Sequence, residues 1–411
     1  MADALARRLG TRDAVALGLG SMLGAGVFAA FAPAARAAGT GLLAGLVLAF
    51  GVAYCNAVSS AELAAEYPTS GGTYIYGRER LGPWPGFVAG WGFVAGKTAS
   101  CAAMALTFAA YAAPGFERPV AVAAVVAVAA VNYRGVTRTA RLTLGLLAVT
   151  LVVLAVAVAG TAGVPSFDPD LIRPAGILQS AGLLFFAFAG YARIATMGEE
   201  VRDPRRTIPH AIRLALAIAA VVYTAVGIGL LSTLGPARLA ASAAPLADAV
   251  RAGGWDWAVP LVRIGAATAS LGALLALVAG VGRTALAMAR HRDLPGWLDA
   301  VHPRFRVPHR AEVAIAAVVV VLVSTVDLRG AIGFSSFGVL VYYLIANLSA
   351  WSLRRAVRPV VGAIGCAVLA ATLPWLSVLC GLALFGVGLA YRWARRARAG
   401  ATPPGPDGAV S

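Results

Sequence analysis

Charged side chains are scarce in this sequence, and lysine is almost absent. Asp, Glu, Lys and Arg make up 13% of the 411 residues, and Lys97 is the single lysine; a soluble domain carries about 25% charged residues. Apolar residues make up 60%, and the mean hydropathy is +0.80. They recur in blocks, and a helix of about 20 apolar residues is what a hydrocarbon layer of about 30 Å demands. The composition excludes an ordinary soluble domain and predicts a multi-pass membrane protein.

Cysteine and histidine are also scarce, with four residues of each. No CxxC spacing occurs, so neither a disulfide framework nor a zinc site is predicted. The histidines fall at or outside the ends of the apolar blocks, and no HExxH or GxSxG motif is present. We therefore expect no enzyme activity, no metal centre and no bound cofactor. The cysteines, each alone in an apolar block, are Cys55, Cys101, Cys366 and Cys380.

Basic residues outnumber acidic ones by 34 to 18, which gives a net charge of +16. The arginines lie between the apolar blocks rather than on one face, and no aromatic-basic module is visible. This pattern favours a lipid bilayer over nucleic acid as the partner. No small-residue cleavage site follows the first apolar block, so we expect that block to be retained as a span.

Twelve apolar segments predict an all-α bundle of about twelve transmembrane helices. The last two segments are separated only around Pro374, so ten or eleven spans remain possible. The segments are 14–35, 40–64, 84–112, 119–133, 141–163, 176–197, 209–234, 257–288, 311–326, 331–352, 359–373 and 375–392.

The placement of arginine predicts the orientation of these helices, because arginine-rich loops stay in the cytoplasm. With twelve spans and a cytoplasmic N-terminus, 24 arginines lie in cytoplasmic segments and six in outer ones. We therefore expect a cell-membrane protein with both termini in the cytoplasm. Its cytoplasmic ends are residues 1–13 and a tail at 393–411, whose final Pro- and Gly-rich stretch predicts disorder.

Glycines interrupt the first and the sixth apolar segments. The first holds glycines at 18, 20, 24 and 26, and glycines at 182, 190 and 198 lie in and just after the sixth. These segments occupy matching places if residues 14–163 and 176–352 are two five-helix repeats and 359–392 adds two further helices. A pair of glycine-interrupted helices at matching places indicates a transporter site between inverted repeats.

An unwound helix at the middle of a membrane exposes backbone groups that need a polar ligand. The N-terminal end of a half-helix suits a carboxylate, whereas free carbonyl groups suit an ammonium group or Na⁺. An α-amino acid presents both charged groups. The alternative is that the glycines only allow close packing of helices, since small residues four apart are common at membrane helix contacts.

Four separated groups of motifs follow one another along the chain. They are Gly20–Phe28, Glu62–Pro68 with Ser70–Tyr74, Phe185–Tyr191 with Gly198–Pro209, and His302–Phe305. In this order they resemble the first helix, the second helix and the loop after it, the sixth helix and its following loop, and the loop after the eighth helix of the amino acid–polyamine–organocation (APC) superfamily, and specifically of a bacterial amino acid permease.

The resemblance implies a five-plus-five inverted repeat with discontinuous helices 1 and 6, two C-terminal helices, and secondary active transport by alternating access. In such permeases a substrate carboxylate meets backbone amides of the first helix, and its ammonium group meets carbonyls at both breaks. An aromatic residue of the sixth helix closes over the substrate. The implied substrate-binding residues are Leu19, Gly20, Ser21, Gly24, Ala25, Gly26, Phe185, Phe188 and Tyr191.

Lys97 lies near the middle of the third span, where an ionisable group is a functional candidate. We expect it to take up and release a proton during transport. In proton-coupled relatives a fifth-helix lysine has this place, but here that position falls near Thr150, which cannot serve. The alternative is that Lys97 binds a backbone carbonyl or a carboxylate and only tethers helices.

No Asp or Glu lies deep in any span, while Lys97 and Arg193 could both face the path. Such a site would repel a dibasic substrate, so neutral amino acids are favoured. A polyamine or cationic amino acid carrier is the alternative within transport, and a permease-like nutrient sensor is the alternative of another class.

Two further hypotheses concern a Na⁺ site and a cytoplasmic gate. Thr268 and Ser270 of the eighth span could complete a Na⁺ site, although lone hydroxyl groups in membrane helices more often bond to their own backbone. Glu199, Glu200 and Arg202 could form a cytoplasmic gate with the N-terminal arginines, or simply a solvated loop.

Overall fold

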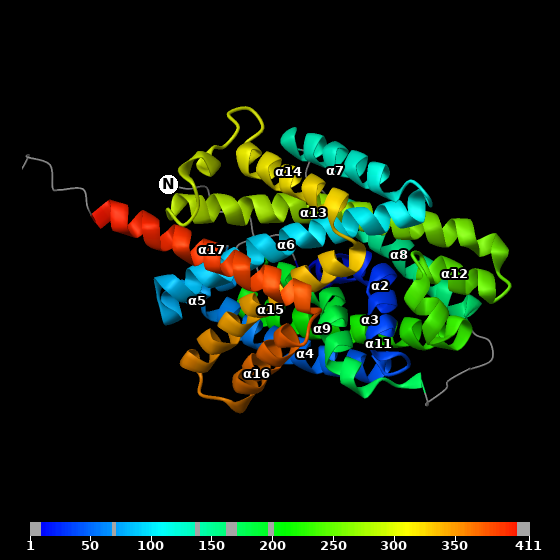
Figure 1. Cartoon of the computed structure of the whole chain (residues 1–411). Coiled ribbons are helices and arrows are strands. Elements are labelled where there is room, and N and C mark those ends of the chain that lie inside the picture. The colour runs from blue at the N-terminus through cyan, green and yellow to red at the C-terminus, as the bar shows by residue number, and fades with distance from the viewer. Residues whose placement is uncertain (1–9, 68–70, 136–139, 162–170, 196–200, 401–411) are drawn as a thin grey trace, which may run out of the picture.

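The computed structural model describes residues 10–67, 71–135, 140–161, 171–195 and 201–400. Every regular element among them is a helix, apart from an isolated bridge between Gly39 and Ile172. The helices pack as a bundle, with the chain returning repeatedly along its length (Figure 1). An all-α membrane fold was predicted from the apolar blocks, and it is confirmed.

The long helices coincide with the predicted apolar segments. They are α4 (Leu42–Glu66), α6 (Pro83–Ala112), α7 (Glu117–Tyr133), α8 (Ala140–Gly160), α11 (Pro204–Ala241), α13 (Val259–Arg290), α14 (His309–Thr325), α15 (Leu328–Leu353), α16 (Val357–Ala371) and α17 (Trp375–Gly400).

The shorter elements make up the first and sixth segments and several connections. They are α1 (Thr11–Met22), α2 (Ala25–Ala29), α3 (Phe31–Ala38), α5 (Thr73–Leu81), α9 (Ile177–Phe188), α10 (Ala192–Ala195) and α12 (Pro245–Ala252). Among the described residues, four 3₁₀ turns join them: η2 (Pro174–Gly176), η3 (Ala189–Tyr191), η4 (Asp256–Ala258) and η5 (Gly296–Asp299).

Within the described residues, eight helices are long and apolar enough to cross a membrane, or nine when the bent first segment is one span. Helices α7 and α14 have 17 residues each and α16 has 15. At about 1.5 Å per residue, these three sit at or below the lower end of the lengths that span a bilayer. They nevertheless lie where the remaining three spans were predicted.

Glycine and proline set several helix ends. Gly82 has a φ of +101°, which suits glycine, and ends α5 just before Pro83 opens α6. Gly235, with a φ of +67°, kinks α11 near its C-terminal end. Asp327 caps α15, because its carboxylate accepts a hydrogen bond from the Gly330 amide at 3.0 Å. These residues explain why the continuous apolar runs stop where they do.

The middle of the bundle is formed by α6 and α15, each of which buries 78% of its most apolar stretch, against 22% for α17. Glycines let their backbones approach closely, since a Cβ on Gly338 would lie 2.8 Å from the Gly92 carbonyl oxygen. Outward faces of other helices expose apolar side chains, with Val221 71% and Val321 60% exposed. Such a surface is what contact with lipid requires.

Two features differ from the sequence-based expectations. The predicted tail at 393–411 starts as a continuation of α17, which runs to Gly400, because Arg and Ala favour helix and the Arg395 guanidinium donates to the Leu294 carbonyl oxygen at 2.7 Å. The rest of the tail, 401–411, lies outside the described residues. Helices α5 and α12 lie between the predicted apolar segments, where no helix was predicted.

Candidate substrate site

The first segment is broken between α1 and α2. Helix α1 ends at Met22, Leu23 and Gly24 are not helical, and α2 starts at Ala25. A bend of 51° at Ala30 then separates the stretch Thr11–Ala29 from α3. Since the first amides and last carbonyls of a helix lack partners within it, this break leaves backbone groups available inside the bundle.

The sixth segment changes its winding at the matching place. Helix α9 ends at Phe188, the tighter turn η3 covers Ala189–Tyr191, and α10 continues from Ala192. A stretch of 3₁₀ helix inside a longer helix marks a hinge or a functional site in many proteins. The glycine-based prediction of irregular first and sixth helices agrees with this geometry.

The two breaks pack directly against each other. A Cβ on Gly26 would lie 2.6 Å from Ala187 Cα, and a Cβ on Gly190 would lie 2.5 Å from the Ser21 carbonyl carbon and oxygen. Neither distance leaves room for a side chain. The glycines therefore serve close packing and discontinuity together, so the two explanations considered for them do not exclude each other.

Two side chains from other helices reach the carbonyl groups at the breaks. The hydroxyl of Tyr223, on α11, lies 2.7 Å from the Met22 carbonyl oxygen and 2.9 Å from that of Ala187. The Lys97 Nζ, on α6, donates to the Ala189 carbonyl oxygen at 3.2 Å. Both side chains are buried. Tyr223 was not identified in the sequence, where it is one tyrosine in an apolar run.

Lys97 therefore contacts the sixth-helix break, as the tethering alternative requires. The same contact places its ammonium group beside the predicted site. Among the described residues Lys97 forms no ion pair, and its one hydrogen bond is to the Ala189 carbonyl oxygen. Thr150, the substitute for the family's fifth-helix lysine, is buried and bonds its own helix at Leu146.

The predicted first-helix residues lie on both sides of the break, which begins later than expected. The Leu19 carbonyl oxygen accepts the Leu23 amide at 2.7 Å, so it belongs to the intact helix. The hydroxyl of Ser21 bonds back to Leu17, and Gly20 faces Thr143 of α8. Gly24, Ala25 and Gly26 are buried at the break itself. Met22 is the carbonyl that the sequence analysis missed.

The aromatic candidates of the sixth helix point to different neighbours. The ring of Phe188 meets that of Tyr223 at a centroid distance of 4.9 Å. The ring of Tyr191 lies 5.1 Å from that of Tyr343 on α15, which Phe185 also contacts at 5.9 Å. All three predicted aromatic residues are buried.

The sodium candidates are not equivalent. The Thr268 hydroxyl bonds to the Ile264 and Gly265 carbonyl oxygens of its own helix, at 2.9 and 3.0 Å. Ser270 is buried, and its hydroxyl has no hydrogen-bond partner among the described residues. It lies next to the part of α13 that packs on Gly24. Of the two hydroxyl groups, only that of Ser270 is without a partner among the described residues, and the sodium hypothesis stays a prediction.

Most residues of the proposed cytoplasmic gate lie outside the part of the chain that the structure describes. Glu199 and Glu200 lie outside the described residues, as do Arg7 and Arg8. Arg202 and Arg12 are exposed, and neither forms an ion pair with another described residue. The gate therefore stays a prediction from the sequence.

A buried charge cluster that the sequence analysis did not foresee lies elsewhere. Asp293, just after α13, is ion-paired with Arg392 of α17 at 2.6 Å and with Arg78 of α5 at 2.9 Å. The Tyr74 hydroxyl donates to the same carboxylate at 2.8 Å. Burial, and next the hydrogen bond to Asp293, raise the pKa of Tyr74, so it remains a donor throughout the physiological range. The cluster joins three elements and does not include the breaks.

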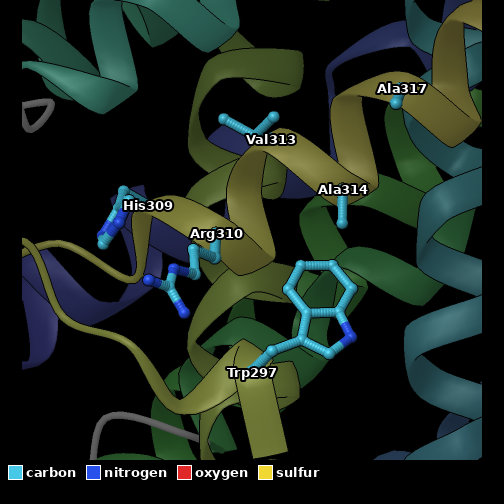
Figure 2. Close-up of a pocket in the computed structure, with 6 residues that line it drawn as sticks. All are labelled: Trp297, His309, Arg310, Val313, Ala314 and Ala317. Carbon is cyan, nitrogen blue, oxygen red and sulfur yellow. The ribbon is translucent and has the colours of Figure 1, made fainter. Parts of the chain in front are cut away.

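The pocket in Figure 2 is also separate from the breaks. It lies between η5 and the start of α14 and contains none of the predicted site residues. Trp297 of η5 and Arg310 of α14 line it, together with His309 and small apolar side chains of α14. No group of three or more potential metal ligands occurs in the described residues.

Comparison with known proteins agrees with this geometry. The family model for amino acid permeases matches residues 9–394. An uncharacterised transporter of Mycobacterium tuberculosis is 61% identical over 96% of this chain and 92% of its own. The branched-chain amino acid permease BcaP of Bacillus subtilis is 26% identical over 92% of this chain and 86% of its own. The chloroplastic cationic amino acid transporter 7 of Arabidopsis thaliana is 28% identical over 84% of this chain and 65% of its own.

These matches confirm the resemblance found in the motifs and indicate a transporter rather than an enzyme. The family match covers both breaks, the lysine between them and nearly all the helices of the bundle. The chain therefore belongs to the amino acid permease family, within the APC superfamily.

Proposed function

We propose that this amino acid transporter carries neutral amino acids by alternating access, with coupling to protons or by exchange. The proposed substrate site lies between the two breaks. Amides of Ala25 and Gly26 would bind the carboxylate, and carbonyl groups of Met22 and Ala187 would bind the ammonium group. The spans α1–α2, α4, α9–α10 and α11 would rock against the remaining helices.

The observation that carries the preference for neutral substrates is the charge beside the breaks. The buried Lys97 ammonium group bonds the Ala189 carbonyl. Among the described residues, no Asp or Glu forms a hydrogen bond or ion pair with either break. A second cationic group on a substrate would meet one positive charge in a low-dielectric site and no compensating carboxylate.

A cationic amino acid or polyamine carrier is the second candidate. The relatives include transporters named for cationic amino acids as well as one named for branched-chain amino acids. This candidate requires that Lys97 be neutral or move away when the substrate enters. A nutrient sensor would keep the same site but move no substrate.

Purified protein in liposomes would separate these functions. Uptake of labelled leucine, alanine, arginine and putrescine would be measured with and without an inward proton gradient. We expect uptake of neutral amino acids, stimulated by the gradient if transport is coupled to protons. Uptake that occurs only when the liposomes contain amino acid would indicate exchange. Transport of arginine or putrescine alone would overturn the substrate class, and binding without any transport would indicate a sensor.

Lys97→Gln tests the role of the lysine in coupling. We expect the variant to lose gradient-stimulated uptake while it still exchanges amino acid across the membrane, because glutamine can donate to Ala189 but cannot carry a proton. Thr107→Val on the same helix is the control, since Thr107 bonds only its own backbone at Ala103. Equal pH dependence in wild type and Lys97→Gln would leave only the tethering role.

A further inference from the structure

Among the described residues, Tyr223 is the one side chain within hydrogen-bond distance of carbonyl groups of both broken segments. Its ring lies in α11, which belongs to neither break, and its exposure is 0%. The Met22 carbonyl belongs to the last residue of α1, and that of Ala187 belongs to the last turn of α9. Helix ends leave such carbonyl groups without intrahelical partners, so a donor from another element can hold them.

A tyrosine hydroxyl carries a single proton, whereas two carbonyl oxygens lie within hydrogen-bond distance. The hydroxyl can therefore donate to one of them at a time and must be shared. The hydroxyl can alternate between the two carbonyl oxygens only while the two breaks remain close together. A separation of α1 from α9 would force the hydroxyl to choose one of them.

The surroundings fix the hydroxyl in this position. The ring of Phe188 packs edge-on against the Tyr223 ring, at a centroid distance of 4.9 Å. Gly26 against Ala187, and Gly190 against Ser21, bring the backbones together on either side of the same contact. Lys97 bonds Ala189 but reaches only the sixth-helix break. The lysine therefore cannot replace a link between the two segments.

We propose that Tyr223 is a positioning residue that holds the two breaks at the separation in which the substrate site is formed. The proposal rests on the transport function proposed above. Because the hydroxyl acts on backbone carbonyls, its effect is the same for every amino acid that the protein carries. Substrate binds to the conformation in which the breaks are held together, so its apparent affinity depends on the population of that conformation.

Tyr223→Phe keeps the ring and removes the hydroxyl. We expect KM to rise about five- to tenfold, the effect of losing one hydrogen bond, and to rise equally for all transported amino acids. Backbone amides flanking both breaks should lose protection against hydrogen exchange together. Thr233→Val is the matched control: this hydroxyl is also on α11 and bonds the carbonyl oxygens of Gly229 and Thr161, away from the breaks.

Three results would overturn the proposal: an unchanged KM with unchanged exchange, loss of protection at one break only, or loss of transport in strict proportion to folded protein. Replacement of Tyr223 by 4-aminophenylalanine, which retains a donor at the ring position, should restore wild-type KM and protection. If Tyr223→Phe does not fold, this variant carries the test, and its failure to protect the breaks overturns the proposal.

Hydrogen exchange separates this inference from the proposed function. If the wild-type protein moves none of the amino acids tested, the proposed substrate class fails. The exchange comparison between wild type and Tyr223→Phe still reports whether one hydroxyl links the two breaks. Unchanged exchange beside normal amino acid uptake would reject the role of Tyr223 and leave the transport function standing.

Discussion

Gly190 occupies a position where the chain has no room for a side chain. An added Cβ would lie 2.5 Å from the Ser21 carbonyl oxygen and 2.6 Å from the Met22 nitrogen. Both are backbone atoms, so neither can move aside by a change of rotamer. The contact between the two breaks can therefore adapt to a larger residue only if the helices themselves shift.

Gly190→Ala should push the breaks apart. We expect uptake to fall by more than about tenfold, with a loss of about 1–3 kcal/mol in stability, as is usual for an extra methyl group in a packed interior. Uptake would be measured per amount of monodisperse protein. Gly51→Ala is the control, because a Cβ at this helical glycine meets nothing within 4 Å. Wild-type uptake by Gly190→Ala would show that the breaks are not in contact during transport.

The sequence could indicate glycines of this kind but not their partners. Gly190 was identified as part of an interrupted helix, whereas Tyr223 was not identified at all. Tyr223 acquires its role only from the folded arrangement, since 201 positions separate it from Met22. No local pattern records such a contact, and a tyrosine in an apolar run resembles an ordinary core residue.

At the scale of the elements, the first and sixth segments were placed correctly and their breaks approximately. The glycines indicated where helices could unwind, but Leu19 remains in the intact helix and the carbonyl at the break is that of Met22. Helices α5 and α12 were missed because they are short and mixed in polarity. Their place is set by tertiary contacts, such as the bond between Tyr74 and Asp293.

Asp293 determines how α5, the end of α13 and α17 meet. Its carboxylate serves two guanidinium groups, and the Arg392 side chain is 4% exposed while that of Asp293 is 5% exposed. The Arg392 guanidinium also lies over the rings of Trp84 and Phe87. Removal of the carboxylate would leave a buried cation with aromatic neighbours and a second cation, Arg78, beside it.

Asp293→Asn should destabilise the protein without changing its substrate range. Breaking a buried ion pair by removing one partner costs about 3–5 kcal/mol, so we expect Tm in detergent to fall by about 5 °C or more. Asp299→Asn provides the comparison, because its pair with Arg290 at 3.0 Å is exposed and contributes about 0–1 kcal/mol. A Tm equal to that of Asp299→Asn would mean that solvent or lipid already screens the buried cluster.

At the scale of the whole molecule, two sets of contacts among the described connecting segments show which helix ends lie together. One set joins the connection after α4, the end of α13 and the end of α17, through Arg78, Asp293 and Arg392. The other joins the end of α3 to the end of α11 and the start of η2, through hydrogen bonds of Arg36 and Arg173. The two sets belong to opposite ends of the bundle, which supports alternating sidedness of successive spans.

The direction of this alternation follows from charge and not from packing. In the twelve-span assignment made from the sequence, the segments on the side of Arg78, Asp293 and Arg392 contain 24 arginines, and those on the opposite side contain six. Because arginine-rich loops are retained in the cytoplasm, the first end is expected to face inward and both termini with it. The fold alone would be equally compatible with either direction, since the helices are apolar along both halves.

Reporter fusions would establish the direction. A green fluorescent protein fused after Ser411 should fluoresce, because it folds only in the cytoplasm, while alkaline phosphatase fused there should be inactive. Phosphatase inserted between Gly253 and Gly254, in the connection after α12, should be active, since this exposed turn belongs to the end with few arginines. The reverse pattern at both positions would place the Asp293 cluster on the outer face. In that case, the proton gradient proposed to act at Lys97 would also run in the opposite direction through the bundle.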